Sequence, residues 1–316
     1  MRSSTPLLFP LAALALTLPV SAQQQRAPFT IAESGQGFQH LSDALMAVRG
    51  QDATVVIAPG TYRECAIQQA GHITFRAATP GSVVFDGTPC EGKAALVLRG
   101  AGSTVDGIVF RNLRVPDGNG AGIRIELGDL TVTNSMFLDS QEGILGATDQ
   151  PTRIRIDRST FSGLGQCDEA PDCAHSIYLA NTGTVSVTNS RFERGTGGHY
   201  VKLRSPMVSI LNNSFDDTRG RKTNYMIDLP EGARGRIAGN VFVQGRGKEN
   251  WSGMIVVAAE QRKYRSAGLV VEDNVASLAP GQDKSPAFVA NVSGERLAVG
   301  ANRLGPGIRA YEARQP

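Results

Sequence analysis

Three short segments of this chain carry reactive side chains at matching positions. Each contains an apolar–polar–apolar triplet, with Tyr178, Lys202 and Asp228 as the central residues. The first residues of the three segments are His175, His199 and Tyr225. Tyr200 and Arg204 flank Lys202 in the middle segment, and two of the four histidines of the chain fall in this set. The three segments therefore predict one patch that combines possible bases, acids and cations.

This combination of side chains suits an anionic sugar polymer. Elimination at a uronate needs a cation for the carboxylate, a base for the C5 proton and an acid for the leaving oxygen, and Lys, Tyr and His fill these roles when their neighbours tune them. We assign Lys202 as base, Tyr200 or His199 as acid, and Arg204 as carboxylate clamp. Substrate-binding roles go to Tyr178, His175, Asp228 and Tyr225. The competing interpretation is that the cations are solvated surface residues and the histidines stabilise turns.

A ladder of phenylalanines predicts the scaffold that aligns these segments. The gaps between successive rungs are 23 to 31 residues, and each rung ends a short β-branched stretch with a turn. The rungs are Phe110, Phe137, Phe161, Phe192, Phe215 and Phe242. A repeat of this length, built from strands and turns, is typical of a solenoid in which neighbouring coils share one core. The fold class we expect is all-β, a single-stranded right-handed parallel β-helix.

The rest of the chain fits one elongated domain over residues 23–316. Residues 35–48 have apolar positions at helical spacing, so we expect an amphipathic helix that caps the open end of the core. The cap then covers about 29–62 and the coils about 63–305. Within the coils, period-two alternation sends Ile177, Val201 and Ile227 inward, and stacks Tyr178, Lys202 and Asp228 in one outer column.

Two motifs resemble a known group. The opening FQHLSDALMAV…VVIAPGTY and the VTNSMF-type turns are similar to right-handed parallel β-helix proteins of the pectate-lyase-like superfamily. The segment 200–205, followed by 212–215, also resembles the strand that bears the catalytic lysine in chondroitinase-B-like and alginate lyases. That resemblance assigns the lysine to Lys202. The arginine that the group carries on the next coil is replaced here by Asp228.

Other enzymes of this fold fit less well. Hydrolases of pectin need two carboxylates that flank the scissile bond, and only Asp228, Glu231 and Glu260 qualify near the patch. We therefore expect a polysaccharide lyase that cleaves a uronate-containing glycan. A non-catalytic glycan-binding or cell-envelope protein is the alternative, and a scaffold without a ligand is the third hypothesis. The expected partner is an acidic polysaccharide or oligosaccharide, and we expect a monomer.

The first residues and the charge indicate the compartment and exclude some partners. Residues 1–22 have a positive start, a short apolar run and a small-residue exit, which predicts a cleaved signal peptide and a periplasmic or secreted protein. A membrane anchor is the alternative, but the run is short and contains two prolines, and we expect no membrane span. The formal net charge of +3, with scattered basic residues, gives no case for nucleic acid.

The four cysteines predict two disulfides. Cys167 and Cys173 flank an acidic insertion, and Cys65 lies 25 residues before Cys90, about one coil. Zinc binding is the alternative, although the chain has no CxxC pair. No cofactor is assigned. The insertion that contains Asp168 and Asp172 is interpreted as a solvated loop closed by a disulfide, with calcium binding as the alternative.

Overall fold

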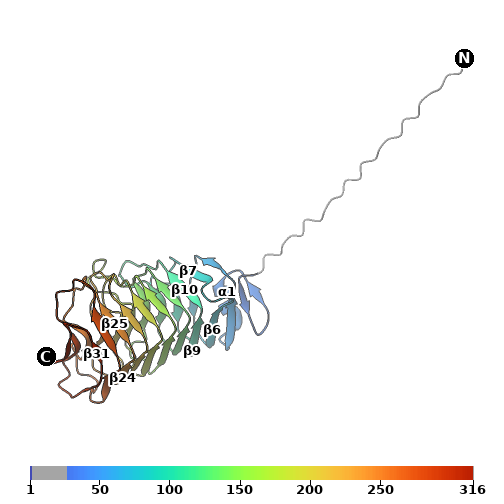
Figure 1. Cartoon of the computed structure of the whole chain (residues 1–316). Helices are drawn as coiled ribbons and strands as arrows, with labels where there is room; N and C mark the ends of the chain where they lie inside the picture. Colours follow the sequence, from blue (N-terminus) through green and yellow to red (C-terminus); the bar gives the residue numbers. More distant parts are fainter. Residues whose placement is uncertain (2–26, 316) are drawn as a thin grey trace.

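The protein forms an elongated stack of coils built from three parallel sheets (Figure 1). This computed structural model describes residue 1 and residues 27–315, so most of the predicted signal segment lies outside the described residues. Each coil contributes one strand to each sheet in turn, which places strands about 25 residues apart side by side. The described residues contain no helix that is both long and apolar enough to cross a membrane.

The three sheets are named A, B and C. Sheet A contains, in spatial order, β2 (Gly37–Phe38), β1 (Phe29–Ile31), β3 (Ala53–Ile57), β6 (His72–Ala77), β9 (Gly102–Asp106), β12 (Asp129–Thr133), β15 (Arg153–Asp157), β18 (Thr184–Thr188), β21 (Met207–Leu211), β24 (Arg234–Ala238), β27 (Leu269–Glu272) and β30 (Ala298–Val299). Sheet B contains β4 (Gly60–Tyr62), β7 (Val83–Asp86), β10 (Ile108–Arg111), β13 (Met136–Leu138), β16 (Thr160–Ser162), β19 (Arg191–Glu193), β22 (Ser214–Asp216), β25 (Val241–Gln244), β28 (Val275–Leu278) and β31 (Arg303–Leu304). Sheet C contains β5 (Ala66–Gln68), β8 (Ala94–Leu98), β11 (Ala121–Ile125), β14 (Glu142–Gly146), β17 (Ile177–Leu179), β20 (Val201–Leu203), β23 (Ile227–Leu229), β26 (Gly253–Val257), β29 (Ala287–Asn291) and β32 (Arg309–Ala313).

A short helix, α1 (Leu41–Val48), covers the N-terminal end of the stack (Figure 1). It buries Leu41, Ala44 and Val48 against the first strands, as a solenoid cap must. The helix begins six residues later than the sequence predicts, because Gly37 and Phe38 pair with β1 as an antiparallel strand instead. Glu64 accepts a hydrogen bond from the backbone N–H of Leu41, which satisfies one donor of the first turn.

The predicted phenylalanine ladder is confirmed, and it forms the centre of the core. From Phe110 to Phe242 the rings stack with centroids 4.8 to 5.1 Å apart, and every ring is fully buried. Phe85 and Tyr62 continue the ladder toward the cap, although the sequence pattern did not include them. Stacked rings add a geometry-specific attraction to the burial of their area.

A second ladder holds the turns that precede the phenylalanines. Asn213, Asn240, Asn274 and Asn302 follow one another, each passing a side-chain amide hydrogen bond to the next at 2.9 to 3.0 Å. In earlier coils a serine hydroxyl at the corresponding turn accepts a hydrogen bond from the backbone of the coil before it, as Ser159 Oγ does from the N–H of Ser135. These bonds satisfy buried turn groups and keep successive coils in step.

We predict that Phe137→Ala lowers the free energy of unfolding by about 3–5 kcal/mol, because it removes a fully buried ring from the continuous stack. The adjacent Met136 is 41% exposed on the opposite face of β13 and provides the control. Met136→Ala changes stability by less than about 1 kcal/mol. Urea unfolding followed by circular dichroism measures the free energy of unfolding of both variants. Equal losses in the two variants would refute a special contribution of the phenylalanine ladder to stability.

Candidate functional site

An open cleft with a volume of about 840 Å³ runs along the outer face of sheet C. Its floor comes from strands β11, β14, β17 and β20, and its walls come from the loops on either side. The cleft is lined mainly by polar and charged side chains, which suits a hydrated polar ligand. The cleft lining includes Arg124, Leu145, His175, Tyr178, His199, Lys202, Arg204, Glu231, Glu260 and Lys263.

The outer column predicted from period two is confirmed. Tyr178 lies beside Lys202, and Lys202 beside Asp228, in the parallel register of β17, β20 and β23. The same column continues backward to Leu145 and Arg124. The inward neighbours Ile177, Val201 and Ile227 are fully buried, as expected for alternate positions of a strand.

Lys202 lies on the outer face but is largely buried by acidic neighbours. Its Nζ donates a hydrogen bond to Glu260 Oε1 at 2.7 Å and lies 3.7 Å from Asp228 Oδ2. The side chain is 11% exposed and that of Asp228 is 4% exposed. A buried ammonium needs such partners, because an unpaired charge in this environment is costly.

Arg204 forms a three-way anchor at the edge of the same cluster. Its Nε donates to the hydroxyl of Tyr178 at 2.9 Å, and one terminal nitrogen donates to Glu231 Oε1 at 2.9 Å. The other terminal nitrogen binds the second oxygen of Glu260. Partial burial would lower the pKa of Arg204, but these hydrogen bonds raise it overall, so the guanidinium stays charged.

Glu260 therefore places its carboxylate between two cations. One oxygen binds Lys202 and the other binds Arg204. Burial alone would raise the pKa of Glu260, but the hydrogen bonds from Lys202 and Arg204 hold it below its usual value. Glu260 comes from the loop between β26 and β27, and its side chain is 42% exposed, so this carboxylate reaches the cluster from the solvent side.

Two histidines stack at the beginning of the same strands. The rings of His175 and His199 lie 5.0 Å apart, and Tyr225 follows at 5.3 Å from His199. His175 Nδ1 accepts a hydrogen bond from the backbone N–H of His199 at 2.9 Å, so this nitrogen carries no proton. Burial, together with the charge of Lys202, lowers the pKa of both imidazoles well below the usual value. Both rings are therefore neutral at neutral pH.

Asp228 is the group that titrates near neutral pH. Its Oδ2 lies 3.4 Å from His199 Nε2 and 3.7 Å from Lys202 Nζ, and its Oδ1 has no hydrogen-bond partner among the described residues. Burial raises the pKa of Asp228 to about 7, although the charge of Lys202 lowers it. A carboxyl that exchanges its proton near pH 7, in contact with both a lysine and a histidine, suits proton transfer.

Tyr200 was assigned to the site, and that assignment is wrong. Its side chain is 1% exposed and packs in the core between Phe192 and Phe215. The hydroxyl donates to the buried Asp217 at 2.8 Å, and burial raises its pKa well above the usual value. The error arises because Tyr200 precedes β20, where the chain is still bending and strict alternation of inward and outward residues has not begun.

The other predicted residues lie in or behind the cleft. His175, Tyr178, His199, Lys202 and Arg204 line it. Asp228 lies behind His199 and Lys202, and Tyr225 packs on Val256 beside the cleft. The positions proposed for substrate binding at Asp228 and Tyr225 are therefore one layer removed from the cleft surface.

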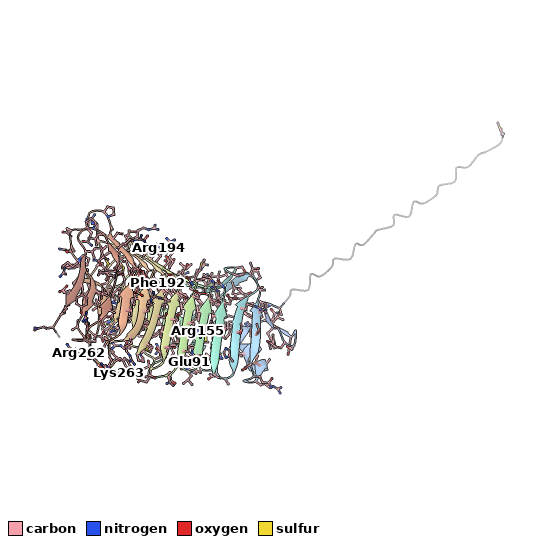
Figure 2. The ribbon with its side chains drawn as sticks, turned by 60° about the horizontal axis from the view of Figure 1, so that its bottom comes forward. Glu91, Arg155, Phe192, Arg194, Arg262 and Lys263 are labelled. Carbon is pink, nitrogen blue, oxygen red and sulfur yellow. A yellow bond between two sulfur atoms is a disulfide. The ribbon has the colours of Figure 1, made fainter. Side chains whose placement is uncertain are left out.

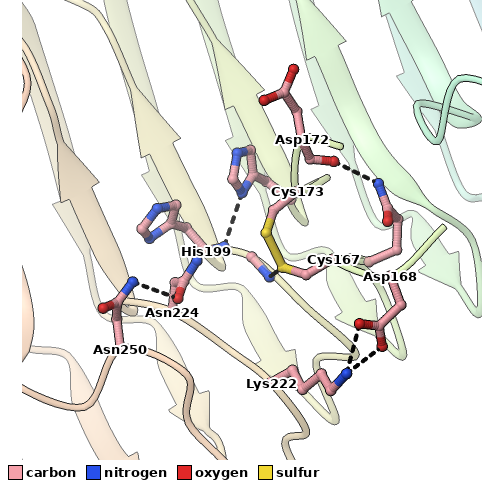
Figure 3. Close-up of a disulfide and its surroundings, with 12 residues drawn as sticks. Cys167, Asp168, Asp172, Cys173, His199, Lys222, Asn224 and Asn250 are labelled. Carbon is pink, nitrogen blue, oxygen red and sulfur yellow. Dashed lines mark hydrogen bonds and ion pairs between the residues drawn. A yellow bond between two sulfur atoms is a disulfide. The ribbon is translucent and has the colours of Figure 1, made fainter. Parts of the chain in front are cut away.

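Both predicted disulfides are formed. Cys65 is joined to Cys90, and Cys167 to Cys173. The second bond closes the acidic insertion into a wall of the cleft next to His199 (Figure 3). The backbone N–H of Gly198 donates to Cys167 Sγ at 3.3 Å, which ties this wall to the strand that follows.

The acidic insertion forms an ion pair with a lysine of a later coil. Both carboxylate oxygens of Asp168 accept hydrogen bonds from Lys222 Nζ at 2.6 Å (Figure 3). Within residues 27–315, Cys167, Cys173 and Glu249 are the one group that brings three possible ligand atoms together. Both sulfurs belong to the disulfide, and calcium takes oxygen ligands, so this group does not fit the ion.

Several residues of the cleft were not assigned from the sequence. Arg124 lies between the inward Ile123 and Ile125, so the alternation that located Lys202 contained the signal that would have found it. Glu260 was considered only as a possible carboxylate of a hydrolase, and Lys263 was not considered. Both come from a loop without regular spacing, and no periodicity predicts where such residues lie.

Comparison with known proteins identifies the fold. A family model described as right handed beta helix region matches residues 94–263, more than half of the chain. A pectin methylesterase from Aspergillus niger is similar in structure, with 13% identity, a TM-score of 0.50, and 85% of this chain and 90% of that chain covered. The right-handed β-helix predicted from the sequence is thus confirmed.

Two further solved structures are similar at lower scores. Escherichia coli ybhc has 12% identity and a TM-score of 0.47, with 97% of this chain and 90% of that chain covered. The Streptococcus pneumoniae surface protein and adhesin PfbA has 12% identity and a TM-score of 0.38, with 87% and 95% covered. No curated protein sequence matches the chain significantly.

We predict that Asp228 makes stability fall as pH rises toward neutrality. Its folded pKa of about 7 lies above the unfolded value of 3.8, so its contribution is complete below that lower value and is lost as pH rises to about 7. The loss amounts to at most about 4 kcal/mol, since one pKa unit corresponds to about 1.4 kcal/mol. Urea unfolding at several pH values gives the slope.

Asp228→Asn should flatten the dependence of the unfolding free energy on pH in this window. The exposed Asp283, changed to Asn, supplies the control and should leave the dependence as in the wild type. An unchanged slope in Asp228→Asn would show that Asp228 is ionised throughout the range.

Proposed function

The chain belongs to the right-handed beta helix family, and from this premise we propose that it is an exported polysaccharide lyase, which cleaves a uronate-containing glycan by β-elimination in the cleft. The two disulfides are typical of proteins that fold in an oxidising compartment and support export. The pectin methylesterase that shares the fold is named for a polysaccharide, pectin.

One observation carries the proposal. The carboxylate of Glu260 is held by Lys202 through one oxygen and by Arg204 through the other, at the surface of an open cleft. Cations arranged in this way recognise a carboxylate through charge-assisted hydrogen bonds. Because Glu260 reaches the pair from a loop on the solvent side, the carboxylate of a bound uronate takes its place when the loop moves aside.

The chemistry then follows from the groups around that carboxylate. Arg204 holds the uronate carboxylate and stabilises the negative charge that develops when the C5 proton leaves. The amine of Lys202 accepts this proton. The C5–H electron pair forms the C4–C5 double bond, the C4–O bond breaks, and the leaving oxygen takes up a proton.

Asp228 and His199 complete the proton balance. His199 lines the cleft and lies 3.4 Å from Asp228, which holds a proton near neutral pH. Nδ1 of His199 is buried, so His199 Nε2 both takes this proton from Asp228 and gives it to the leaving oxygen. Lys202, which has gained the C5 proton, lies 3.7 Å from the same carboxyl and returns it there, so the site is restored.

This arrangement differs from the lyases that the segment around Lys202 resembles. Those lyases carry an arginine on the next coil, whereas Asp228 occupies that register position here. Arg204 supplies a cation from the same coil as Lys202, two residues further along the chain. Tyr200 is too deeply buried to protonate the leaving oxygen, so His199 alone has the role of acid.

A non-catalytic glycan-binding protein is the second candidate. Lys202, Arg204, Glu231 and Glu260 form what we call the Lys202 cluster, in which both cations pair with acidic side chains. Cations held in such pairs favour binding over proton abstraction. This candidate predicts that an acidic polysaccharide binds the cleft and is recovered intact after long incubation.

We expect wild-type protein to release unsaturated products from at least one acidic polysaccharide, detected by their ultraviolet absorbance. Lys202→Met keeps the length of the side chain and removes the amine, so kcat should fall by at least about 100-fold. Lys284→Met, at an exposed lysine outside the cleft, is the control. Full activity of Lys202→Met would remove this residue from the mechanism, and intact polymer in every wild-type reaction would reject elimination.

We further predict that Glu260→Gln lowers KM for the polysaccharide by about tenfold, because the neutral amide competes less well than a carboxylate for Lys202 and Arg204. Glu272→Gln is the matched control, since Glu272 pairs with Arg236 away from the cleft. A higher KM in Glu260→Gln would mean that Glu260 contacts the substrate favourably and is not displaced by it.

A further inference from the structure

Arg124 is a cation in the cleft that forms no ion pair with an acidic side chain of the described residues. It lies on β11 at the same register position as Lys202, and it lines the end of the cleft nearer the N-terminal cap. Its Nε is buried and has no hydrogen-bond partner among the described residues. By contrast, Lys202, Arg204 and Lys263 all form ion pairs in the same cleft.

The surroundings of Arg124 do not neutralise it. Its neighbours in the column are Val97 and Leu145, which belong to an apolar cluster on the outer face of sheet C. Arg124 acts electrostatically on Glu142, whose Oε2 also has no hydrogen-bond partner among the described residues. Burial raises the pKa of Glu142 well above the usual value although Arg124 lowers it, which favours the neutral acid.

The distance from Arg124 to the Lys202 cluster is set by the coils. Arg124 is three strands before Lys202, and parallel strands lie about 4.8 Å apart, so the two positions are roughly 14 Å apart along the stack. Leu145 and Tyr178 occupy the two positions between them and line the same cleft. An apolar and aromatic floor of this kind suits the faces of sugar rings.

We propose that Arg124 forms a second subsite, which binds a further carboxylate or sulfate of the same glycan chain that occupies the Lys202 cluster. The substrate is then a polyanion whose acidic groups recur along the chain, and it lies parallel to the stack from β11 to β20. This inference rests on the proposed function only for the identity of the ligand as an acidic glycan. It concerns binding and does not depend on whether the bond is cleaved.

The physical reason is the cost of an unpaired guanidinium. A partly buried charge with an unsatisfied N–H group loses hydration that nothing in the protein replaces. A carboxylate or sulfate replaces it with charge-assisted hydrogen bonds, for which the planar guanidinium is well suited. Lys202 and Arg204 must first exchange Glu260 for the ligand, whereas Arg124 has no competing carboxylate to release.

The test measures affinity as a function of ligand length by isothermal titration calorimetry. The probes are oligogalacturonates, which carry carboxylates alone, and chondroitin sulfate oligosaccharides, each from disaccharide to octasaccharide. All proteins carry Lys202→Met so that the ligand stays intact. Arg124→Gln is compared with Arg155→Gln, which removes the same charge from exposed Arg155 on β15 of sheet A (Figure 2).

We expect affinity in the parent protein to rise once the oligosaccharide is long enough to reach Arg124. Arg124→Gln should lose this gain, about tenfold for the longest ligand, and bind the disaccharide unchanged. Arg155→Gln should match the parent at every length. A gain with oligogalacturonates shows that a carboxylate is sufficient, and the gain should shrink at high salt.

Two results overturn the inference. If Arg124→Gln binds the longest ligand as the parent does, or weakens all lengths equally, Arg124 is not a separate subsite, while the proposed function stands. If neither the parent nor the wild-type protein binds any acidic oligosaccharide, the inference and the proposed function both fail. Binding with the expected length dependence, but without unsaturated products from the wild-type protein, supports the subsite and rejects only the elimination.

Discussion

The whole structure depends on the hydrogen-bonded register between parallel coils. Each coil repeats the position of the one before it at a spacing of about 4.8 Å, so a side chain on one strand has a fixed neighbour on the next. The stacked phenylalanines from Phe85 to Phe242 fill the interior of successive coils, and the asparagine ladder fixes the later turns. A shift of one strand by one residue against its neighbour would turn its inward side chains outward. The core therefore fixes the register, and the outer columns are as regular as the core.

The site adds a second constraint, which is the compensation of buried charge. Lys202 and Asp228 face outward from the coil, but the walls of the cleft remove them from most of the solvent. Charges in such a place persist only with partners. Lys202 and Asp228 lie 3.7 Å apart, and Glu260 reaches Lys202 from a loop and also binds Arg204. In this cluster the positions of the protons depend on which carboxylate binds Lys202 and Arg204. A ligand that replaces Glu260 therefore changes these positions directly.

The sequence was sufficient wherever a residue lies inside a strand. The phenylalanine spacing predicted the fold, and period two placed Tyr178, Lys202 and Asp228 in one column because backbone geometry alone decides those positions. It failed at Tyr200, which precedes the strand and turns into the core, and at the start of α1, where pairing with β1 outweighs helix propensity. The position of Glu260 could not be predicted for another reason, because it depends on how an irregular loop packs against another coil.

The side chains on the outer face of sheet C also determine where the polar cluster begins and ends. Before Tyr178 the column is apolar at Val97 and Leu145, and after Asp228 it is apolar again at Val256 and Ala290. Tyr225 packs over the second apolar group and closes that end, so the cleft extends from the cluster toward the N-terminal cap. Arg124 is the one charge of the column in that direction before the cap, among the described residues. A polymer that enters the cleft therefore meets a charged cluster, then an apolar floor and then a single cation, and this order follows from a few outward residues on an otherwise uniform ladder.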